Sequence, residues 1–310
     1  MSQHHRPRWG LIQICLAGVL WGTGGLGVQL IRRHEPMSVV TISAWRMLLA
    51  AVVLVAVVLA LRQAGSVRAL LCSHPWRAVA VGTGTALYQA FYFGSVVAVG
   101  VTVSTVVSLG IAPVLLTVVD AVRRDRRPGR GRLVVLGAAL GGLLLVSATS
   151  GAGDTGPRPL LGVLLALGSG TAYAAATELG RPLAQVAGPL ALTTTTTTIG
   201  TLFLLPFGLV AALGDNRLVT TDPAAVTGLV YLGVMTMALA YGLLYAGLRT
   251  TTGSSAVIAT LLEPVTAAVA AALVLDERLR ALGVAGTLLI LVAVAGLGGE
   301  EEPVAVPPPA

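Results

Sequence analysis

The sequence contains two copies of one pattern, and this internal repeat limits the possible folds more than any other feature. Scarce or helix-breaking residues recur at spacings of 151 to 153 positions. Tyrosine occurs six times in 310 residues, and four of the six fall into two matching pairs. We therefore expect two copies of a unit of about 150 residues. The matched residues are Pro36 and Pro189, Tyr88 and Tyr241, Tyr92 and Tyr245, and Pro113 and Pro264.

The unit must be embedded in a membrane. Hydrophobic residues make up 55% of the chain and charged residues 11%, against roughly 25% charged residues in soluble domains. The net charge of +7 comes from arginines, which stand singly between apolar runs and are typical of topology signals rather than of nucleic-acid binding. Cys15, Cys72 and the four histidines form neither a disulfide framework nor a metal-ligand pattern. We expect an all-α integral membrane protein without metal or other cofactor.

Charge-free runs predict ten membrane-spanning helices. The run 9–31 can cross a hydrocarbon layer of about 30 Å, and the run 78–119 suits two helices joined near Gly100–Thr102. The expected spans are 9–31, 36–61, two within 78–119, 133–148, 160–177, 189–214, 224–248, 253–275 and 281–298. The expected units are an N-terminal segment 1–8, a five-helix repeat 9–148, a loop 149–159, a second repeat 160–298 and a disordered acidic, proline-rich tail 299–310.

The arginines also predict the orientation of the chain. With the N-terminus inside, thirteen arginines fall on the inner side and six on the outer side, mainly because of the loop 123–132. The positive-inside rule then places both termini in the cytoplasm. Because five spans are an odd number, the second repeat enters the membrane upside down relative to the first. Inverted repeats of this kind enclose a site near the middle of the bilayer and are typical of transporters.

Several short motifs allow a family to be named. They are Trp21–Gly22, Arg46 after Pro36, Ala112–Pro113, Glu263–Pro264, and the exit Leu275-Asp276-Glu277-Arg278-Leu279. With them the chain resembles, over residues 9–298, the ten-span EamA-type members of the drug/metabolite transporter superfamily. The first repeat departs from the pattern, with Asp125-Arg126-Arg127 where an acidic Glu-Arg exit is expected. The resemblance implies a transporter of amino acids, metabolites or drug-like compounds, and does not discriminate between these substrates.

Two charged residues stand out because charges deep in a membrane are costly. Glu263 lies ten residues into its span and Arg46 about ten residues after Pro36, so each is roughly 12–15 Å deep. We expect them to meet at similar depth and to form or flank a substrate and proton site, with Glu263 as the proton-coupling group. Alternatively, Glu263 caps the helix break at Pro264, and Arg46 extends toward the membrane surface.

Proline and aromatic residues complete the expected substrate site. Pro113 and Pro264 each leave a helical carbonyl group without its usual hydrogen bond, which favours a helix kink beside a cavity. A kink that serves only helix packing would give the same sequence pattern. Tyr88 and Tyr92 share one helical face, as do Tyr241 and Tyr245, which suits a cavity wall or an interfacial belt. We assign all of them to substrate binding. Trp21 joins this group, with Tyr173 as a weaker repeat mate.

Two further patterns have structural explanations. The hydroxyl groups of the run 193–198, six consecutive threonines, are expected to bond to carbonyl groups of their own helix. The GxGxxG-like run 22–27 lies inside a membrane span without a preceding strand, so it is not a dinucleotide site. Gly18 and Gly22, four residues apart, instead suit close helix packing.

The function expected from these features is secondary active transport, with export as the favoured direction. No phosphate-binding loop of the GxxxxGK[ST] kind is present, so ATP does not drive it directly. The expected partners are a small-molecule substrate, the lipid bilayer of a bacterial cytoplasmic membrane and protons; the oligomeric state is left open. The alternatives are a channel or sensor, and a membrane-embedded enzyme, for which no catalytic cluster is visible in the sequence.

Overall fold

The computed structural model is helical throughout the residues that it describes, which are 6–123, 125, 127–149, 158–212, 218–274 and 281–300. The first half comprises α1 (Arg6–His34), α2 (Val39–Ala60), α3 (Ala64–Ser73), α4 (Pro75–Val99), α5 (Val101–Arg123) and α6 (Arg130–Thr149). The second comprises α7 (Pro159–Val186), α8 (Pro189–Ala212), α9 (Pro223–Tyr231), η1 (Leu232–Leu239), α10 (Ala240–Gly247), α11 (Gly253–Ala259), α12 (Leu262–Val274) and α13 (Ala281–Glu300). Segment 1–5, most of the loop 149–159, the exit 275–279 and the tail beyond residue 300 lie outside the described residues.

Local sequence explains where many helices begin. Side-chain oxygens accept hydrogen bonds from backbone N–H groups in the first turn of three helices, and proline occupies the first helical position of others, where its missing N–H costs nothing. The capping residues are Ser38 for α2, Asp222 for α9 and Thr252 for α11, and the prolines are Pro75, Pro159, Pro189 and Pro223. These polar and proline positions fix the boundaries between otherwise uniform apolar runs.

Of two connections in the first half, the sequence predicted the turn between α4 and α5 but not the helix α3 between α2 and α4. The turn between α4 and α5 consists of Gly100, whose φ of 91° favours glycine, and it lies where we expected it. The helix α3 was not expected, because its ten residues are too few to cross a membrane. Its Leu70 is buried, and α3 packs against α4 and α8.

The protein crosses the membrane several times. Within the described residues, eight helical segments are long and apolar enough to do so. They correspond to eight of the ten expected spans. The other two expected spans are α4, whose Tyr88, Gln89 and Tyr92 lower its hydropathy, and α13, whose apolar part is shorter. Many large apolar side chains are exposed on the outside of the bundle, as a lipid-facing surface requires.

The main helix contacts follow an exchange pattern: they are preserved when each helix is replaced by its counterpart in the other half. Helix α1 packs against α10 and α12, and its counterpart α7 packs against α4 and α5. Two further large contacts join equivalent helices, α2 with α8 and α6 with α13, and the contact of α4 with α8 is matched by that of η1 with α2. Between α6 and α13 the backbones meet at Gly142 and Gly286, where a Cβ atom on either glycine would lie within 3 Å of the other's carbonyl oxygen. Swapping the halves therefore preserves the main helix contacts, as an internal repeat predicts.

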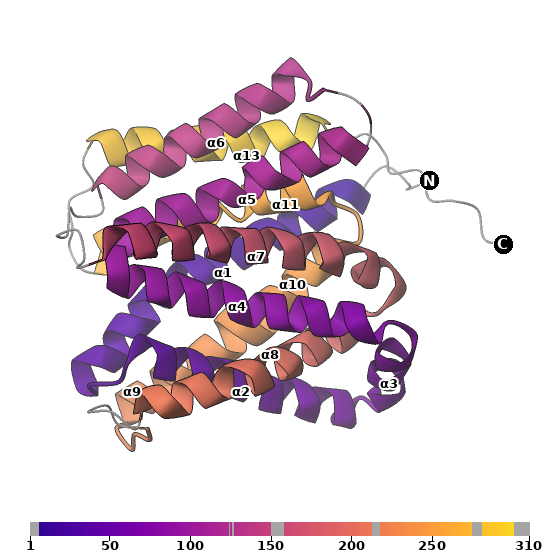
Figure 1. The fold of residues 1–310 in the computed structure, drawn as a ribbon, viewed down its shortest axis with the longest axis vertical. Helices are drawn as coiled ribbons and strands as arrows, with labels where there is room; N and C mark the ends of the chain where they lie inside the picture. Colours follow the sequence, from indigo (N-terminus) through magenta and orange to yellow (C-terminus); the bar gives the residue numbers. More distant parts are fainter. Residues whose placement is uncertain are drawn as a thin grey trace.

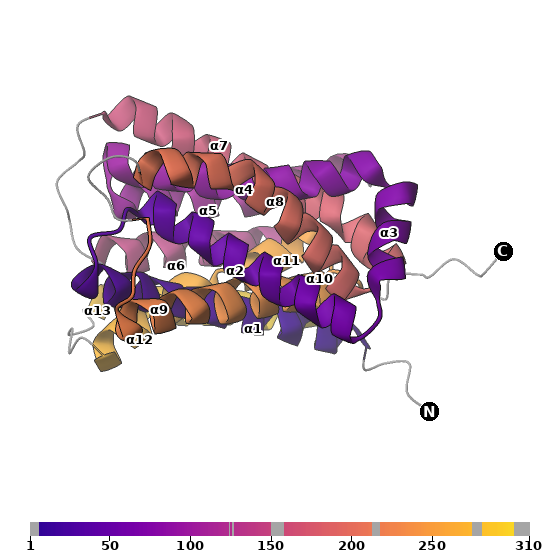
Figure 2. The same ribbon diagram turned by 90° about the horizontal axis from the view of Figure 1, so that it is seen from below.

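Most helices run across the bundle from one side to the other, so the bundle has two distinct ends, at the left and right of Figure 1. We call them the α3 end and the α9 end, after the helices that lie there; the same two helices mark opposite ends in Figure 2. At the α9 end, His34 at the end of α1 is 3.6 Å from Asp222 at the start of α9, and the Arg158 N–H donates to the Ala98 carbonyl oxygen at 3.1 Å. The connection 248–252, between α10 and α11, belongs to the α3 end. The functional site lies between these ends.

Candidate functional site

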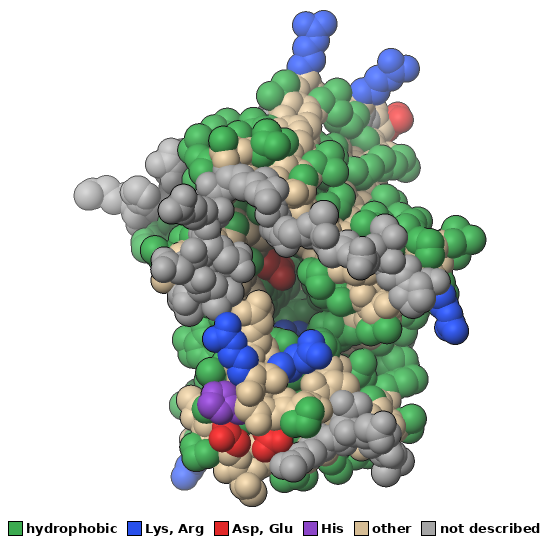
Figure 3. Space-filling view, turned by 90° about the vertical axis from the view of Figure 1, so that its left-hand side faces the viewer, with side chains coloured by type: hydrophobic (Ala, Val, Ile, Leu, Met, Phe, Trp, Pro, Cys, Tyr) green, Lys and Arg blue, Asp and Glu red, His purple; other side chains and the backbone are tan. Residues whose placement is uncertain are grey.

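A cavity of about 450 Å³ is enclosed by α1, α2, α4, α5, α6, η1 and α12. It draws on both halves of the chain and opens as a hollow at the α9 end, where basic side chains stand at its rim (Figure 3). Most small-molecule sites have volumes of roughly 300–1,000 Å³. The polar residues that line it are Gln29, Ser43, Arg46, Tyr88, Gln89, Tyr92, Thr102, Thr105, Ser147 and Glu263.

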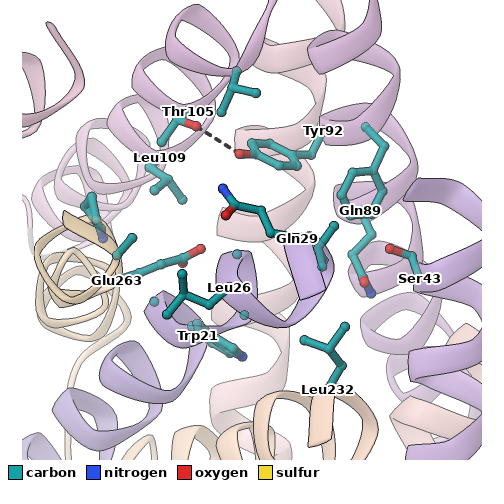
Figure 4. A pocket seen from close by; sticks show the side chains of 18 of the residues that line it. Trp21, Leu26, Gln29, Ser43, Gln89, Tyr92, Thr105, Leu109, Leu232 and Glu263 are labelled. Carbon is teal, nitrogen blue, oxygen red and sulfur yellow. Dashed lines mark hydrogen bonds between the residues drawn. The ribbon is translucent and has the colours of Figure 1, made fainter. Parts of the chain in front are cut away.

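Glu263 reaches the cavity because the expected ninth span is broken. Helix α11 ends at Ala259, and α12 begins at Leu262, so Glu263 lies in the first turn of α12 with Pro264 beside it. The Thr260 carbonyl oxygen, which Pro264 cannot satisfy, accepts from the Glu263 N–H at 2.9 Å instead. A helix N-terminus favours a nearby carboxylate. The break therefore presents an acidic group to the cavity in a favourable setting (Figure 4).

A close contact between two glycines of α1 and the backbone around the break positions this break. A Cβ atom on Gly22 of α1 would lie 2.5 Å from both the Glu263 carbonyl oxygen and Thr266 Cβ. A Cβ atom on Gly18 would lie 3.2 Å from Thr260 Cα. The expected packing role of these two glycines is therefore seen, and it sets α1 directly against the start of α12.

Arg46 lines the same cavity from α2. Its guanidinium group donates to Oε1 of Gln89, whose amide nitrogen lies 3.2 Å from Met47 Sδ. The described ion pairs do not include one between Arg46 and Glu263, so the two charges share the cavity without direct contact. Gln89 stands about 100° around the helix from Tyr88, so the two side chains cannot face the same spot squarely. Both residues line the cavity because its wall wraps around α4.

Aromatic rings form a continuous chain from the cavity into the core. Tyr88 contacts Tyr173 with ring centroids 5.1 Å apart, and Trp21 contacts Tyr241 at the same separation. These two contacts are equivalent under exchange of the halves. The Trp21 indole N–H donates at 2.8 Å to the carbonyl oxygen of Thr236 in η1, a π-helix, a form that often occurs at functional sites. The rings thus fix the inner wall of the cavity.

Six of the nine residues that we expected to bind substrate line the cavity. They are Trp21, Arg46, Tyr88, Tyr92, Glu263 and Pro264. Within this group, Tyr92 is held by a 2.9 Å hydrogen bond with Thr105 (Figure 4).

The other three, Pro113, Tyr241 and Tyr245, are not among the lining residues, which corrects that expectation. Tyr241 and Tyr245 pack behind Trp21, and Tyr245 is only 2% exposed in the core. Pro113 is buried within an unbroken α5.

Sequence reasoning missed several residues of the site. Gln29 extends from α1 into the cavity near Glu263 and Tyr92 (Figure 4). An available signal was its position eight residues after Trp21, which places it about 80° around the helix, so that both side chains can line one broad wall. Tyr173 was noted as a repeat mate of Trp21, and its hydroxyl group lies 3.0 Å from Thr260 Oγ1 at the helix break.

Polar contacts join the helices at the α3 end, away from the cavity. Ser254 of α11 donates to Asp120 of α5, and Arg123 pairs with Glu178 of α7. Ser255 of α11 accepts from Arg132 at 3.2 Å. Arg181 donates to the Thr251 carbonyl oxygen at 3.2 Å. None of these residues lines the cavity. We call this set, with its centre at α11, the α3-end network.

The comparisons with known proteins identify the family. A model of the EamA-like transporter family matches residues 8–148 and, a second time, residues 160–299. The chain belongs to the EamA-like transporter family. This is a family of transporters, not of enzymes. No group of three or more His, Cys, Asp or Glu residues within the described ranges is placed to hold a metal ion.

Individual relatives agree with the family assignment. The chain is 28% identical over 212 residues to a Bacillus subtilis (strain 168) protein named "Uncharacterized transporter YwfM", over 67% of this chain and 69% of that protein. A solved structure described as "Crystal structure of protein" matches with a TM-score of 0.75 and 17% identity, over 93% of this chain and 95% of that one. The latter likeness shows the fold alone.

Proposed function

We propose that this EamA-family protein is a proton-coupled secondary transporter that exports a small metabolite, amino acid or drug-like solute by alternating access. In this proposal, ten helices span a bacterial cytoplasmic membrane as an inverted repeat of two five-helix halves, residues 9–148 and 160–298, with both termini in the cytoplasm. The α9 end then faces outward and the α3 end inward.

One observation carries the proposal: the cavity opens at the α9 end, while the α3-end network joins the helices at the other end. The exchange pattern of helix contacts supports a second state, in which the halves trade conformations and the cavity opens at the α3 end. A channel is disfavoured because the chain of rings from Tyr88 to Tyr245 lies between the cavity and the α3 end.

The proposed substrate site is the cavity, with Trp21, Arg46, Tyr88, Tyr92, Glu263 and Pro264 in its wall. Glu263 is the proposed proton carrier, because it is the acidic residue among the lining residues and its carboxyl group faces the cavity. In export, a proton entering from outside would reach Glu263 first and would be released inside after the halves exchange. Substrate would then move in the opposite direction.

The test begins with an untargeted comparison of metabolites inside and outside cells with and without the gene. The solute that accumulates in cells without the gene is then used in proteoliposomes that contain the purified protein. We expect counterflow of labelled solute, and net transport that is driven by an imposed pH gradient. Solute flux that shows neither counterflow nor dependence on the pH gradient would contradict the proposal and would indicate a channel.

A further inference from the structure

The route into the cavity carries more positive than negative charge. A vestibule lined by Val28, Gln29, Arg32 and Arg33 adjoins the cavity, and Val28 and Gln29 line both. Arg32 and Arg33 are exposed, in keeping with the basic side chains at the rim in Figure 3. Inside the cavity, Arg46 is the cationic lining residue and Glu263 the acidic one. A solute that enters from the α9 end therefore passes arginines before it meets a carboxylate.

The guanidinium group of Arg46 has more N–H donors than it has described hydrogen bonds. A guanidinium group carries five N–H donors, and the described hydrogen bond of Arg46 is the one to the neutral amide of Gln89. Its Nε atom is buried without a hydrogen-bond partner. No described carboxylate lies within ion-pair distance of it. An arginine at membrane depth with only a neutral partner is unfavourable, so an anionic ligand would complete its surroundings.

Gln89 orients the guanidinium group of Arg46 for such a ligand. The Gln89 side chain is 2% exposed and is itself fixed by Met47. It accepts from one guanidinium nitrogen and thereby orients the planar group at the cavity wall. A planar guanidinium with free N–H groups matches the geometry of a carboxylate, which it can bind through two parallel hydrogen bonds.

We infer that the cargo is an organic anion, whose carboxylate or similar planar oxyanion binds Arg46 while its apolar or aromatic body lies against Trp21, Tyr88 and Tyr92. This inference rests on the proposed function, since it takes the cavity as the substrate site. Arg32 and Arg33 attract the anion to the vestibule. Glu263 of α12 carries the proton, and the positive charge that balances the cargo is that of Arg46.

The first experiment varies the charge of a ligand on one constant body. Phenylacetate, phenylacetamide and phenethylamine have the same ring and a similar chain but are anionic, neutral and cationic. We expect phenylacetate to raise the melting temperature of the purified, full-length protein saturably and to change its tryptophan fluorescence, since Trp21 lines the cavity. The amide and the amine should bind at least tenfold more weakly. Equal binding of the three, preference for the amine, or no response to phenylacetate would overturn the inference.

The second experiment alters Arg46 and its partner. Arg46→Gln should weaken phenylacetate binding roughly 10- to 100-fold, the scale of a charge-assisted hydrogen bond, and Arg46→Lys should weaken it less. Should Arg46→Gln fail to fold, Gln89→Glu is informative. It supplies a permanent carboxylate beside the guanidinium and should compete with phenylacetate to a similar extent. A merely structural Arg46 would leave phenylacetate binding unchanged in Gln89→Glu.

Matched controls separate this inference from the proposed function. Arg68→Gln, which removes an exposed arginine on α3, should leave binding unchanged. Glu263→Gln should lose pH-driven transport but bind phenylacetate at least as tightly as the wild type, because it removes a negative charge from the cavity. Anion binding without counterflow would refute the proposed function alone. Counterflow of a neutral or cationic cargo would refute the anion inference alone.

Discussion

The fourth span of each half shows how far the two repeats have diverged. In the first half this span is the unbroken helix α5, with Pro113 in its interior and Ala112 before it. In the second half it is divided into α11 and α12, and Glu263 precedes the equivalent Pro264. The same proline therefore lies within a continuous helix in one half and at the start of a new helix in the other. The repeat accounts for the helical scaffold, whereas the acidic group that lines the cavity comes from the second half alone.

The second span shows the complementary difference. Arg46 of α2 corresponds, at the 153-residue spacing, to Ile199 of α8. The cavity thus receives its cation from the first half and its acid from the second, and each has an apolar repeat mate. A symmetric pair of charges would repeat the same group on both sides. In the proposed mechanism, the two different groups divide the work: Arg46 binds the cargo and Glu263 carries a proton.

The two ends of the molecule differ in the same way. At the α3 end, Glu178 and Ser254 belong to the polar network. Their repeat mates, at a spacing of 152 residues, are Leu26 and Thr102, which line the open cavity at the α9 end. Exchange of the halves would bring Leu26 into the position that Glu178 now has. We therefore expect a polar seal at the α3 end in the present state and a more apolar seal at the α9 end in the other.

The largest expected effect comes from removing the acid that only the second half provides. Glu263→Gln should lower pH-driven transport roughly 100-fold or more, the scale on which a positioned proton-transfer group contributes. The measurement is pH-dye and solute flux in proteoliposomes. Ala112→Glu combined with Glu263→Ala, which moves the acid to the first half, should not restore transport, because α5 is unbroken there. Wild-type coupling in Glu263→Gln would refute the role of this residue.

The next largest effect concerns the contact that holds the broken span. Gly22→Ala should destabilise the protein by about 1–3 kcal/mol, the usual cost of overpacking, because its Cβ atom would lie 2.5 Å from the Glu263 carbonyl oxygen. Thermal unfolding in detergent measures this effect. Gly25→Ala, three residues further along the same helix, has no atom within 4 Å of the new Cβ and should be neutral or slightly stabilising. Equal stability of both variants would show that α1 does not constrain α12.

A smaller effect is expected at the polar seal. Glu178→Gln removes the ion pair with Arg123, whose side chain is 62% exposed. Such pairs contribute about 0.5–1 kcal/mol, so opening of the α3 end should increase two- to fivefold. Reaction of a cysteine at Thr251, a 1% exposed position at this end, reports the opening.

His34→Gln provides the matched control for this seal, since it alters the contact between His34 and Asp222 at the α9 end. It should leave the reaction rate at position 251 unchanged. A rate that Glu178→Gln does not raise would show that the network is not a seal.

The smallest effect is expected in the threonine run. Thr195 donates to the Ala191 carbonyl oxygen of its own helix at 2.8 Å, as predicted for this run, and its repeat mate in α2 is Ile42. Because the first half already has an apolar β-branched residue there, Thr195→Val should change the unfolding free energy by less than about 0.5 kcal/mol. A loss above 1 kcal/mol would indicate that the hydroxyl group has a tertiary role.

Much of the helical scaffold could be predicted because it depends on local properties of the chain. Apolar runs, capping residues and prolines determine where α1, α2, α7 and α8 begin, and only a glycine such as Gly100 makes so tight a turn between α4 and α5 favourable. A helix break at Pro264 was one of the two interpretations of Glu263, but its position between α11 and α12 was not predicted, since Thr260 and Leu261 have no strong helix-breaking tendency. Its position depends on Gly22 and on Tyr173, which belong to other helices.

The site was harder to predict than the scaffold because it depends on which helices meet. Depth alone identified Arg46 and Glu263 as cavity residues, but it did not reveal that Gln89 is the partner of Arg46. Tyr241 and Tyr245 repeat the spacing of Tyr88 and Tyr92, yet they face the core, because the residues that line the cavity come from α4 and not from α10. Repeat symmetry predicts equivalent positions, not equivalent surroundings.

The central claim is that one cavity is exposed alternately at the two ends. The most direct test is the reactivity of Gly25→Cys, in the cavity wall, and of Thr251→Cys, at the α3 end, each in a chain without Cys15 and Cys72. A membrane-impermeant thiol reagent is applied from each side of oriented vesicles, with and without a pH gradient. We predict that position 25 reacts from outside and position 251 from inside, and that the two rates change in opposite directions. Rates that rise and fall together, or reaction of one position from both sides, would contradict the account.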